Sequence, residues 1–140
     1  LMTRWRDSLA LFSAVDYLIK TGCKRIAFFS APFTMEISKN RKNGYLDALR
    51  KNGIKIDENL IYVCDSRESA MHLTEKVLKE KNRPDAFFAI NDDTASGILY
   101  AVKRAHPIRP LLRYNKMDML WVWLPAKCYS NVLTMNRILV

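Results

Sequence analysis

Three short apolar runs, each followed by a helical pattern, constrain the fold of this chain more than any other feature of its 140 residues. The runs predict strands at residues 25–30, 60–64 and 85–90. The helical spacing of apolar residues predicts helices at 8–21, 38–52, 66–82 and 92–105. Strands that alternate with helices through short loops are typical of a parallel sheet. We therefore expect an α/β fold, a parallel sheet with helices on both faces.

Residues 106–140 do not continue this alternation. Pro107 and Pro110 end the fourth helix, because proline cannot donate the backbone hydrogen bond that a helix requires. The apolar run at 119–124 fits a buried strand, but no glycine or acidic turn follows it. We therefore expect one lobe over residues 1–105 and an atypical C-terminal segment over residues 106–140.

The composition argues against a membrane or disulfide-bonded protein. The chain contains no run of about 18 apolar residues, the length that a membrane span requires. Its N-terminal stretch, with Asp7 inside the apolar part, makes a poor signal peptide. Cys23, Cys64 and Cys128 are widely spaced and form no CxxC motif. This pattern predicts reduced thiols in a cytoplasmic protein, not a disulfide frame or a metal site.

No motif for catalysis or for cofactor binding is present. The chain lacks the sequences GxGxxG, GxxxxGK[ST] and GxSxG, so neither a dinucleotide site, a Walker-type phosphate site nor a nucleophile elbow is expected. The net charge of +9 is compatible with nucleic-acid binding. However, the basic residues are spread along polar helix faces, which favours a solvated surface. We expect neither an enzyme nor a cofactor.

The polar cluster after the third expected strand is the main candidate site. Asn91, Asp92 and Asp93 follow the apolar run directly and stand where a helix begins. At the carboxyl end of a strand in an open α/β sheet, such side chains lie where ligands bind. The alternative is that Asn91 and Asp92 only cap the helix, because their side-chain oxygens accept hydrogen bonds from its first amides. This segment alone favours capping.

Arg41 is the second candidate, near the start of the helix expected at 38–52. From that position its guanidinium can reach across the carboxyl edge of the sheet and bind paired hydroxyls or a carboxylate. The alternative is an exposed arginine in the basic run with Lys39 and Lys42. Asp65, which with Glu68 matches a helix-capping pair, also allows a receiver-like phosphotransfer domain by analogy of fold alone.

Several segments together resemble the effector-binding core of LacI-type transcriptional regulators, which have the periplasmic-binding-protein-like (type I) fold. The segment 14–32 contains the pattern G-x-x-R-I-A, and 41–57 contains R-x-x-G-[FWY]-x-x-A-L-x-x-x-G-I. The segment 83–105 contains P-D-A-x-x-x-x-N-D-x-x-A-x-G, and 60–82 fits by length and pattern. The resemblance covers about residues 14–105.

The resemblance implies a two-lobed cytoplasmic sensor. In the family a small molecule, often a sugar or a purine, binds between the lobes, and a separate N-terminal helix-turn-helix binds operator DNA as a dimer. The positions of Arg41, Asn91 and Asp92 face the effector, which favours ligand binding over the simpler interpretations of Arg41 and Asn91.

Two other classes remain as alternatives at this point. One is a periplasmic sugar-binding protein of a transport system, which has the same fold. The other is an α/β enzyme with its active site at the strand ends, for which no nucleophile and base are evident. Because the headpiece and the first lobe are not in this sequence, we expect a fragment or an altered reading of a longer regulator gene.

Overall fold

The computed structural model describes residues 2–34, 36–105, 111–114, 120–123 and 131–134, with side chains described within 8–105. The helices are α1 (Met2–Lys20), α2 (Glu36–Lys51), α3 (Arg67–Leu78) and α4 (Asp92–Ala105), with a short 3₁₀ turn, η1, at Glu58–Leu60. The strands are β1 (Ile26–Ser30), β2 (Ile61–Val63), β3 (Ala86–Ala89), β4 (Leu111–Tyr114), β5 (Leu120–Trp123) and β6 (Asn131–Thr134).

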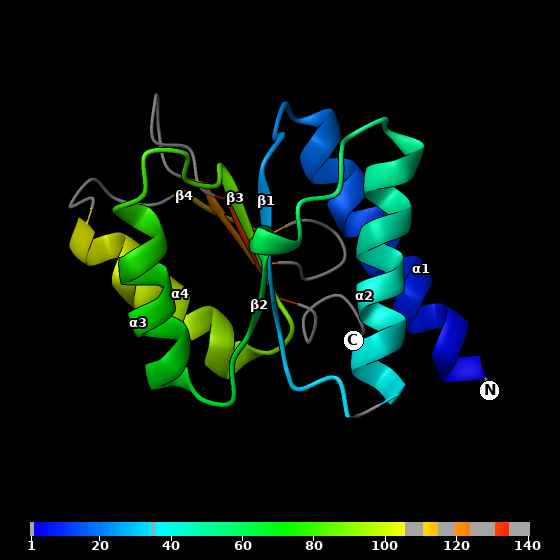
Figure 1. Cartoon of the computed structure of the whole chain (residues 1–140), viewed down its shortest axis with the longest axis horizontal. Coiled ribbons are helices and arrows are strands. Elements are labelled where there is room, and N and C mark those ends of the chain that lie inside the picture. The colour runs from blue at the N-terminus through cyan, green and yellow to red at the C-terminus, as the bar shows by residue number, and fades with distance from the viewer. Residues whose placement is uncertain (1, 35, 106–110, 115–119, 124–130, 135–140) are drawn as a thin grey trace.

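The expected alternation of helices and strands is confirmed over the first part of the chain. The strands form one sheet in the order β2-β1-β3-β6-β5-β4, in which β1 pairs in parallel with β2 and with β3. Figure 1 shows α1 and α2 on one side of these strands and α3 and α4 on the other. The α/β fold with helices on both faces of a parallel sheet is therefore present.

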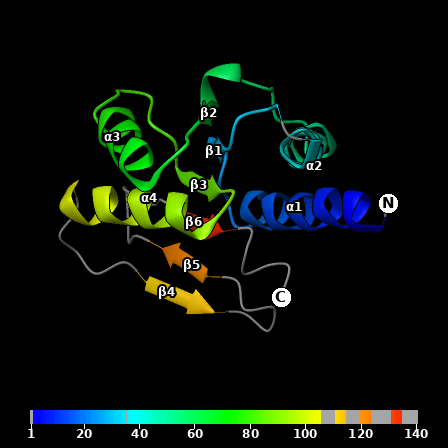
Figure 2. The ribbon, with the colours of Figure 1, turned by 90° about the horizontal axis from the view of Figure 1, so that it is seen from below.

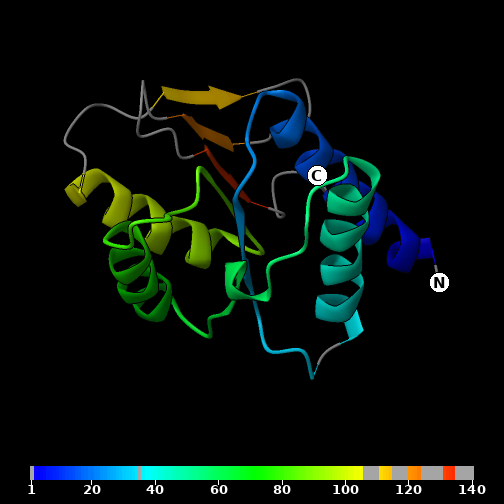
Figure 3. The ribbon, with the colours of Figure 1, turned by 45° about the horizontal axis from the view of Figure 1, so that its top comes forward.

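The far end of the sheet is not entirely parallel. β6 pairs in parallel with β3, but β5 is antiparallel to both β6 and β4. Figures 2 and 3 show β4 and β5 beyond β6, at the opposite end of the sheet from β2. Only residues 115–119 separate β4 from β5, too few for the crossover that parallel strands require. The division of the chain at residue 105 stays a prediction.

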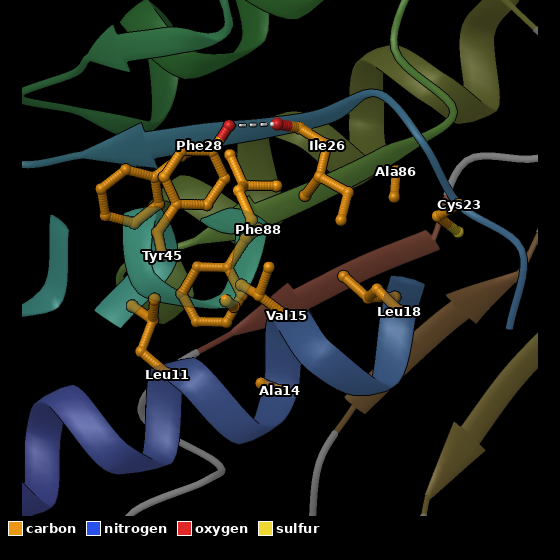
Figure 4. Close-up of a cluster of buried hydrophobic side chains, with 12 residues drawn as sticks. Leu11, Ala14, Val15, Leu18, Cys23, Ile26, Phe28, Tyr45, Ala86 and Phe88 are labelled. Atoms are coloured by element: carbon orange, nitrogen blue, oxygen red, sulfur yellow. Dashed lines mark hydrogen bonds between the residues drawn. The ribbon is translucent and has the colours of Figure 1, made fainter. Parts of the chain in front are cut away.

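Alternating residues of the central strands supply two separate cores. All five residues of β1 are buried, and Phe28 and Phe88 contact the α1 and α2 side, whereas Phe29 and Phe87 contact the α3 and α4 side. Figure 4 shows Tyr45 beside Phe28, with its hydroxyl directed at the backbone of β1. That hydroxyl donates to the carbonyl oxygen of Ile26 at 2.8 Å, so the buried phenol is satisfied.

Helix boundaries agree with the sequence where glycine ends the helix. Gly22 and Gly53 have positive φ values of 103° and 67°, and Cys23 and Ile54 then donate back to the helices that precede them. The first helix, however, begins at Met2 and not near residue 8. The third ends at Leu78, before the expected residue 82, because residues 79–82 carry no apolar side chain to pack on the sheet.

The start of the third helix corrects another expectation. Its N-cap is Ser66, whose hydroxyl accepts from the Ser69 amide at 3.1 Å, while the Ser69 hydroxyl accepts from the Ser66 amide at 3.2 Å. The expected cap, Asp65 with Glu68, is therefore wrong by one residue. The Cys64 amide still donates to the Ser30 carbonyl at 2.8 Å, so pairing with β1 continues past β2 and delays the helix.

Candidate functional site

The segments that follow β1, β2 and β3 meet at one edge of the sheet, which we call the strand-end edge: residues 31–34, 64–66 and 90–93. In Figure 1 this edge lies at the bottom of the molecule, where each strand leads to its helix. Phe29 is in register with Ala89, and its carbonyl accepts from the Ile90 amide at 3.0 Å. The ends of β1 and β3 are therefore aligned in the sheet. In open α/β sheets, ligands bind at this end of the strands.

Arg41 reaches this edge from α2. Its Nη1 donates to the carbonyl oxygen of Ile90 at 3.4 Å, which links the second helix to the end of β3. The side chain is half-buried, whereas the alternative interpretation expects an exposed arginine in a basic run. The contact holds the guanidinium directly beside the residue that precedes Asn91.

Asn91 caps α4, as the simpler interpretation of this residue predicts. Its Oδ1 accepts from the Thr94 amide at 2.9 Å, and its carbonyl accepts from the Ala95 amide at 3.0 Å. Capping uses the side-chain oxygen and not the amide nitrogen, so the same residue can donate to a second group. Asp92 and Asp93 follow in the first turn of α4 and are exposed, where the helix dipole favours their negative charge.

The structure thus brings Arg41, Asn91 and Asp92 to one edge from two elements that are far apart in sequence. The guanidinium supplies donors, Asn91 supplies amide donors, and Asp92 supplies acceptors. That set suits a ligand with several hydroxyl or amide groups. Within the described part of the chain, no three histidine, cysteine or acidic side chains are grouped closely enough to hold a metal ion.

Asp85, in the P-D-A pattern, lies at the end of the strands that is opposite to the strand-end edge. Its carboxylate accepts from the backbone amides of Lys24 at 2.8 Å and Arg25 at 3.0 Å, just before β1 begins. The two contacts join residues that are 61 and 60 positions apart in the sequence. The structural role of Asp85 was not predicted from the sequence. Its position after a proline and before a strand is the signal that could have indicated this role.

We expect Asp85→Ala to destabilise the fold without affecting the strand-end edge. The substitution removes both charge-assisted hydrogen bonds and should lower the free energy of unfolding by about 1–2 kcal/mol. Urea denaturation followed by circular dichroism measures the change. Asp47→Ala is the matched control, because the exposed Asp47 pairs with the exposed Arg50 on α2, and it should change stability by less than about 0.5 kcal/mol. Equal effects would contradict this role for Asp85.

Cys64 belongs to the strand-end edge and precedes the capping serines of α3. Burial raises the pKa of its thiol from 9.0 to about 11, although a hydrogen bond with the Ser69 side chain opposes the shift. A thiol with this pKa holds very little thiolate at neutral pH and is a poor nucleophile. The thiol therefore fits a packing role, in agreement with the expectation of a reduced cysteine.

We expect iodoacetamide to label Cys64 slowly in the folded protein at pH 8 and rapidly in urea. The raised pKa keeps the folded thiol protonated until the pH approaches about 11, whereas the unfolded thiol ionises near 9. Peptide mass spectrometry after timed labelling measures both rates. Labelling in the folded protein as fast as in urea would mean that the thiol is exposed and ionised.

Comparison with known proteins identifies the family that this chain resembles. Residues 15–107 match the family model of the periplasmic binding protein-like domain. The chain is 28% identical to the HTH-type transcriptional regulator MalR of Streptococcus pneumoniae over 76% of its length. It is 35% identical to the HTH-type transcriptional repressor CytR of Escherichia coli over 68% of its length. It spans 33% of the first relative and 28% of the second.

The chain is also similar to a solved structure. A sugar-binding transcriptional regulator of the LacI family from Escherichia coli, in complex with phosphate, superposes with a TM-score of 0.71. It is 26% identical, and the alignment covers 91% of this chain and 40% of that one.

The chain belongs to the periplasmic binding protein-like domain family. Within that family it corresponds to part of the effector-binding domain of LacI-type transcriptional regulators, so the resemblance seen in the sequence is confirmed. Because these relatives are transcriptional regulators, the expectation that the chain is not an enzyme is also confirmed. Across the described helices, none is long and apolar enough to cross a membrane.

Proposed function

We propose that the strand-end edge binds a small-molecule effector, a sugar or a purine-like compound, through Arg41, Asn91 and Asp92. The observation that supports the proposal is the Arg41 contact with the Ile90 carbonyl, because Ile90 directly precedes Asn91 in the chain. A hydrogen bond from an arginine to a ligand oxygen is charge-assisted and is about twice as strong as a neutral one.

In the proposed whole protein, the effector is sensed in the cytoplasm between this lobe and a second one. Binding shifts the population between two lobe arrangements, because the effector has a higher affinity for one of them. Operator DNA is bound by an N-terminal domain outside this chain, and the full-length protein is a homodimer. The regulators MalR and CytR, both named as HTH-type proteins, support this role over that of a transport protein.

A thermal-shift screen tests the proposal. D-ribose, D-glucose, D-glucose 6-phosphate and adenine are the probes, because a bound ligand raises the melting temperature by mass action. We expect Arg41→Ala to weaken binding of a stabilising probe by about 10- to 100-fold, the range for loss of a charged hydrogen bond.

Arg50→Ala is the matched control, since Arg50 lies on the same helix but is exposed and pairs with Asp47 at 3.0 Å. The control should bind the stabilising probe as the wild type does. A stabilising probe that Arg41→Ala binds equally well would show that the ligand lies elsewhere. A cooperative melt that no probe shifts would contradict binding by this chain.

A further inference from the structure

The tetrapeptide Arg-Lys-Asn-Gly occurs twice in this chain, at residues 41–44 and 50–53. An asparagine that precedes glycine is chemically labile, because glycine has no side chain to hinder attack by its backbone nitrogen, and asparagine counts among the thermolabile residues. The fold places the two copies differently. Asn43 and Gly44 lie inside α2, whereas Asn52 and Gly53 follow Lys51, the last residue of that helix.

Asn52 fastens the end of α2 to α1, the helix beside it in Figure 1. Its Nδ2 donates to Oδ1 of Asp16 at 2.8 Å and to the carbonyl oxygen of Ala48 at 2.8 Å. Asp16 lies on α1 and is only 7% exposed. The Asn52 side chain is therefore a neutral donor held between a buried carboxylate and the last turn of its own helix.

The backbone at Asn52 is held by the terminal turn of α2. The Gly53 amide donates to the Arg50 carbonyl at 3.1 Å, and the Ile54 amide donates to the Leu49 carbonyl at 2.9 Å. Terminal turns open locally at a smaller free-energy cost than packed helix interiors do. Opening this turn frees the Asn52 side chain and the Gly53 nitrogen together.

The backbone at Asn43 is held more firmly, although its side chain is exposed. The helix α2 continues for about two turns on each side of it. Gly44 packs so closely on α1 that a Cβ atom there would collide with the carbonyl oxygen of Ser8. Rearranging the Asn43–Gly44 backbone therefore requires opening the middle of the helix and its contact with α1.

We propose that Asn52 is a deamidation site of this protein, and that its modification releases the end of α2 from α1. Asn43, in the same tetrapeptide, is protected by the helix around it. The hydrogen bond to Asp16 limits the rate, because the Asn52 side chain must leave that carboxylate before it can react. An aged chain is therefore less stable than a newly made one.

The reaction needs no reagent other than water. The backbone nitrogen of Gly53 attacks the side-chain carbonyl carbon of Asn52, and a C–N bond forms that closes a succinimide ring. The Gly53 nitrogen loses its proton to solvent, and the side-chain nitrogen leaves as ammonia. Water then adds to one of the two ring carbonyls and breaks its bond to the ring nitrogen, which leaves aspartate or isoaspartate at position 52.

Either product removes the contact between the helices. A carboxylate at position 52 has no N–H to donate, so its oxygens would face those of Asp16 and Ala48. Lys20 and Lys51 also face Asp16, at 2.8 and 3.8 Å, but they are 65% and 55% exposed, so solvent screens the attraction that they offer. Isoaspartate also lengthens the backbone before Ile54, which packs against the core.

Timed incubation of the full chain in mildly alkaline buffer tests the proposal. Peptide mass spectrometry detects the replacement of an amide NH2 by OH at each asparagine. In the folded protein, the product should accumulate several-fold faster at Asn52 than at Asn43, because the helix end opens more often than the interior. In urea, where the same tetrapeptide is unstructured at both positions, the two rates should be equal.

Two substitutions test the role of Asp16. Asp16→Ala removes the acceptor, so it should accelerate deamidation at Asn52 several-fold and leave the rate at Asn43 unchanged. Asp47→Ala is the matched control, because Asp47 is exposed on α2 and pairs with Arg50. It should change neither rate.

The product is tested directly by Asn52→Asp. This variant should melt about 4–8 °C below the wild type, since it replaces two hydrogen bonds by contacts between oxygens. Asn43→Asp makes the same chemical change at an exposed position of the same helix and should shift the melting temperature by less than about 2 °C.

Several results would overturn the proposal. Equal rates at the two asparagines in the folded protein, or no product at Asn52, would show that the helix end is no more reactive than the interior. Equal acceleration of both sites by Asp16→Ala would indicate global unfolding instead of local release. An Asn52→Asp variant that melts with the wild type would show that the modification leaves the helices joined. None of these measurements uses a ligand, so their outcome is independent of the proposed function.

Discussion

Phe28→Ala is expected to lower the free energy of unfolding by about 3–5 kcal/mol, as truncation of a fully buried phenylalanine does. Phe28 is 0% exposed on the central strand β1. Its ring stacks on Tyr45 with centroids 5.1 Å apart and lies 5.9 Å from the ring of Phe88. The cavity would therefore open where α2 meets the sheet. Because a domain of this kind has a total stability of about 5–15 kcal/mol, the variant should be marginally folded.

Urea denaturation followed by circular dichroism measures this loss as a lower midpoint. Phe33→Ala is the matched control, because Phe33 is only half-buried in the loop after β1, where the Lys42 ammonium lies 5.0 Å from its ring centroid. Loss of that cation–π contact should cost about 0.5–1 kcal/mol. If both variants unfolded at the same urea concentration, the core described around Phe28 would be wrong.

Gly97→Ala is expected to lower the free energy of unfolding by about 2–3 kcal/mol, in the range for overpacking of a close contact. Helix propensity alone predicts the opposite sign, a gain of about 1 kcal/mol. Tertiary packing reverses the sign because α4 crosses α3 at this glycine. A Cβ atom there would collide with the carbonyl oxygen of Arg67 and would lie 3.0 Å from the Met71 amide nitrogen.

The collision involves backbone atoms, so neither helix can relieve it by a change of side-chain rotamer. Ser96→Ala, at the neighbouring half-buried position of α4, provides the control and should change stability by less than about 0.5 kcal/mol. Differential scanning calorimetry of the three proteins gives the comparison. A higher melting temperature for Gly97→Ala would mean that α3 and α4 are not in backbone contact.

Much of the fold follows from local patterns. The apolar runs and the helical spacing predicted α1 to α4 and β1 to β3 in the correct order. Gly22 and Gly53 follow the ends of α1 and α2, since glycine adopts a positive φ at no steric cost. Arg41 and Asn91 were predicted at one edge, because parallel strands with right-handed crossovers share the edge at which they end.

The N-cap of α3 was predicted wrongly because two neighbouring residues are both suited to cap the helix. Asp65 and Ser66 are both good N-cap residues, and propensity does not choose between them. The choice depends on how far β2 stays paired with β1, which is a tertiary contact between Cys64 and Ser30. The apolar run at 119–124 fitted a buried strand and becomes β5, but β4 and the antiparallel pairing of the two strands were not predicted.

Local propensity and periodicity are enough to predict the helices α1 to α4 and the strands β1 to β3, because both can be read within one segment of the chain. The close helix crossing at Gly97 and the carboxylate bridge from Asp85 to the start of β1 follow instead from the tertiary arrangement. Each of these depends on distances between segments that are remote in the chain, and no local pattern encodes such distances.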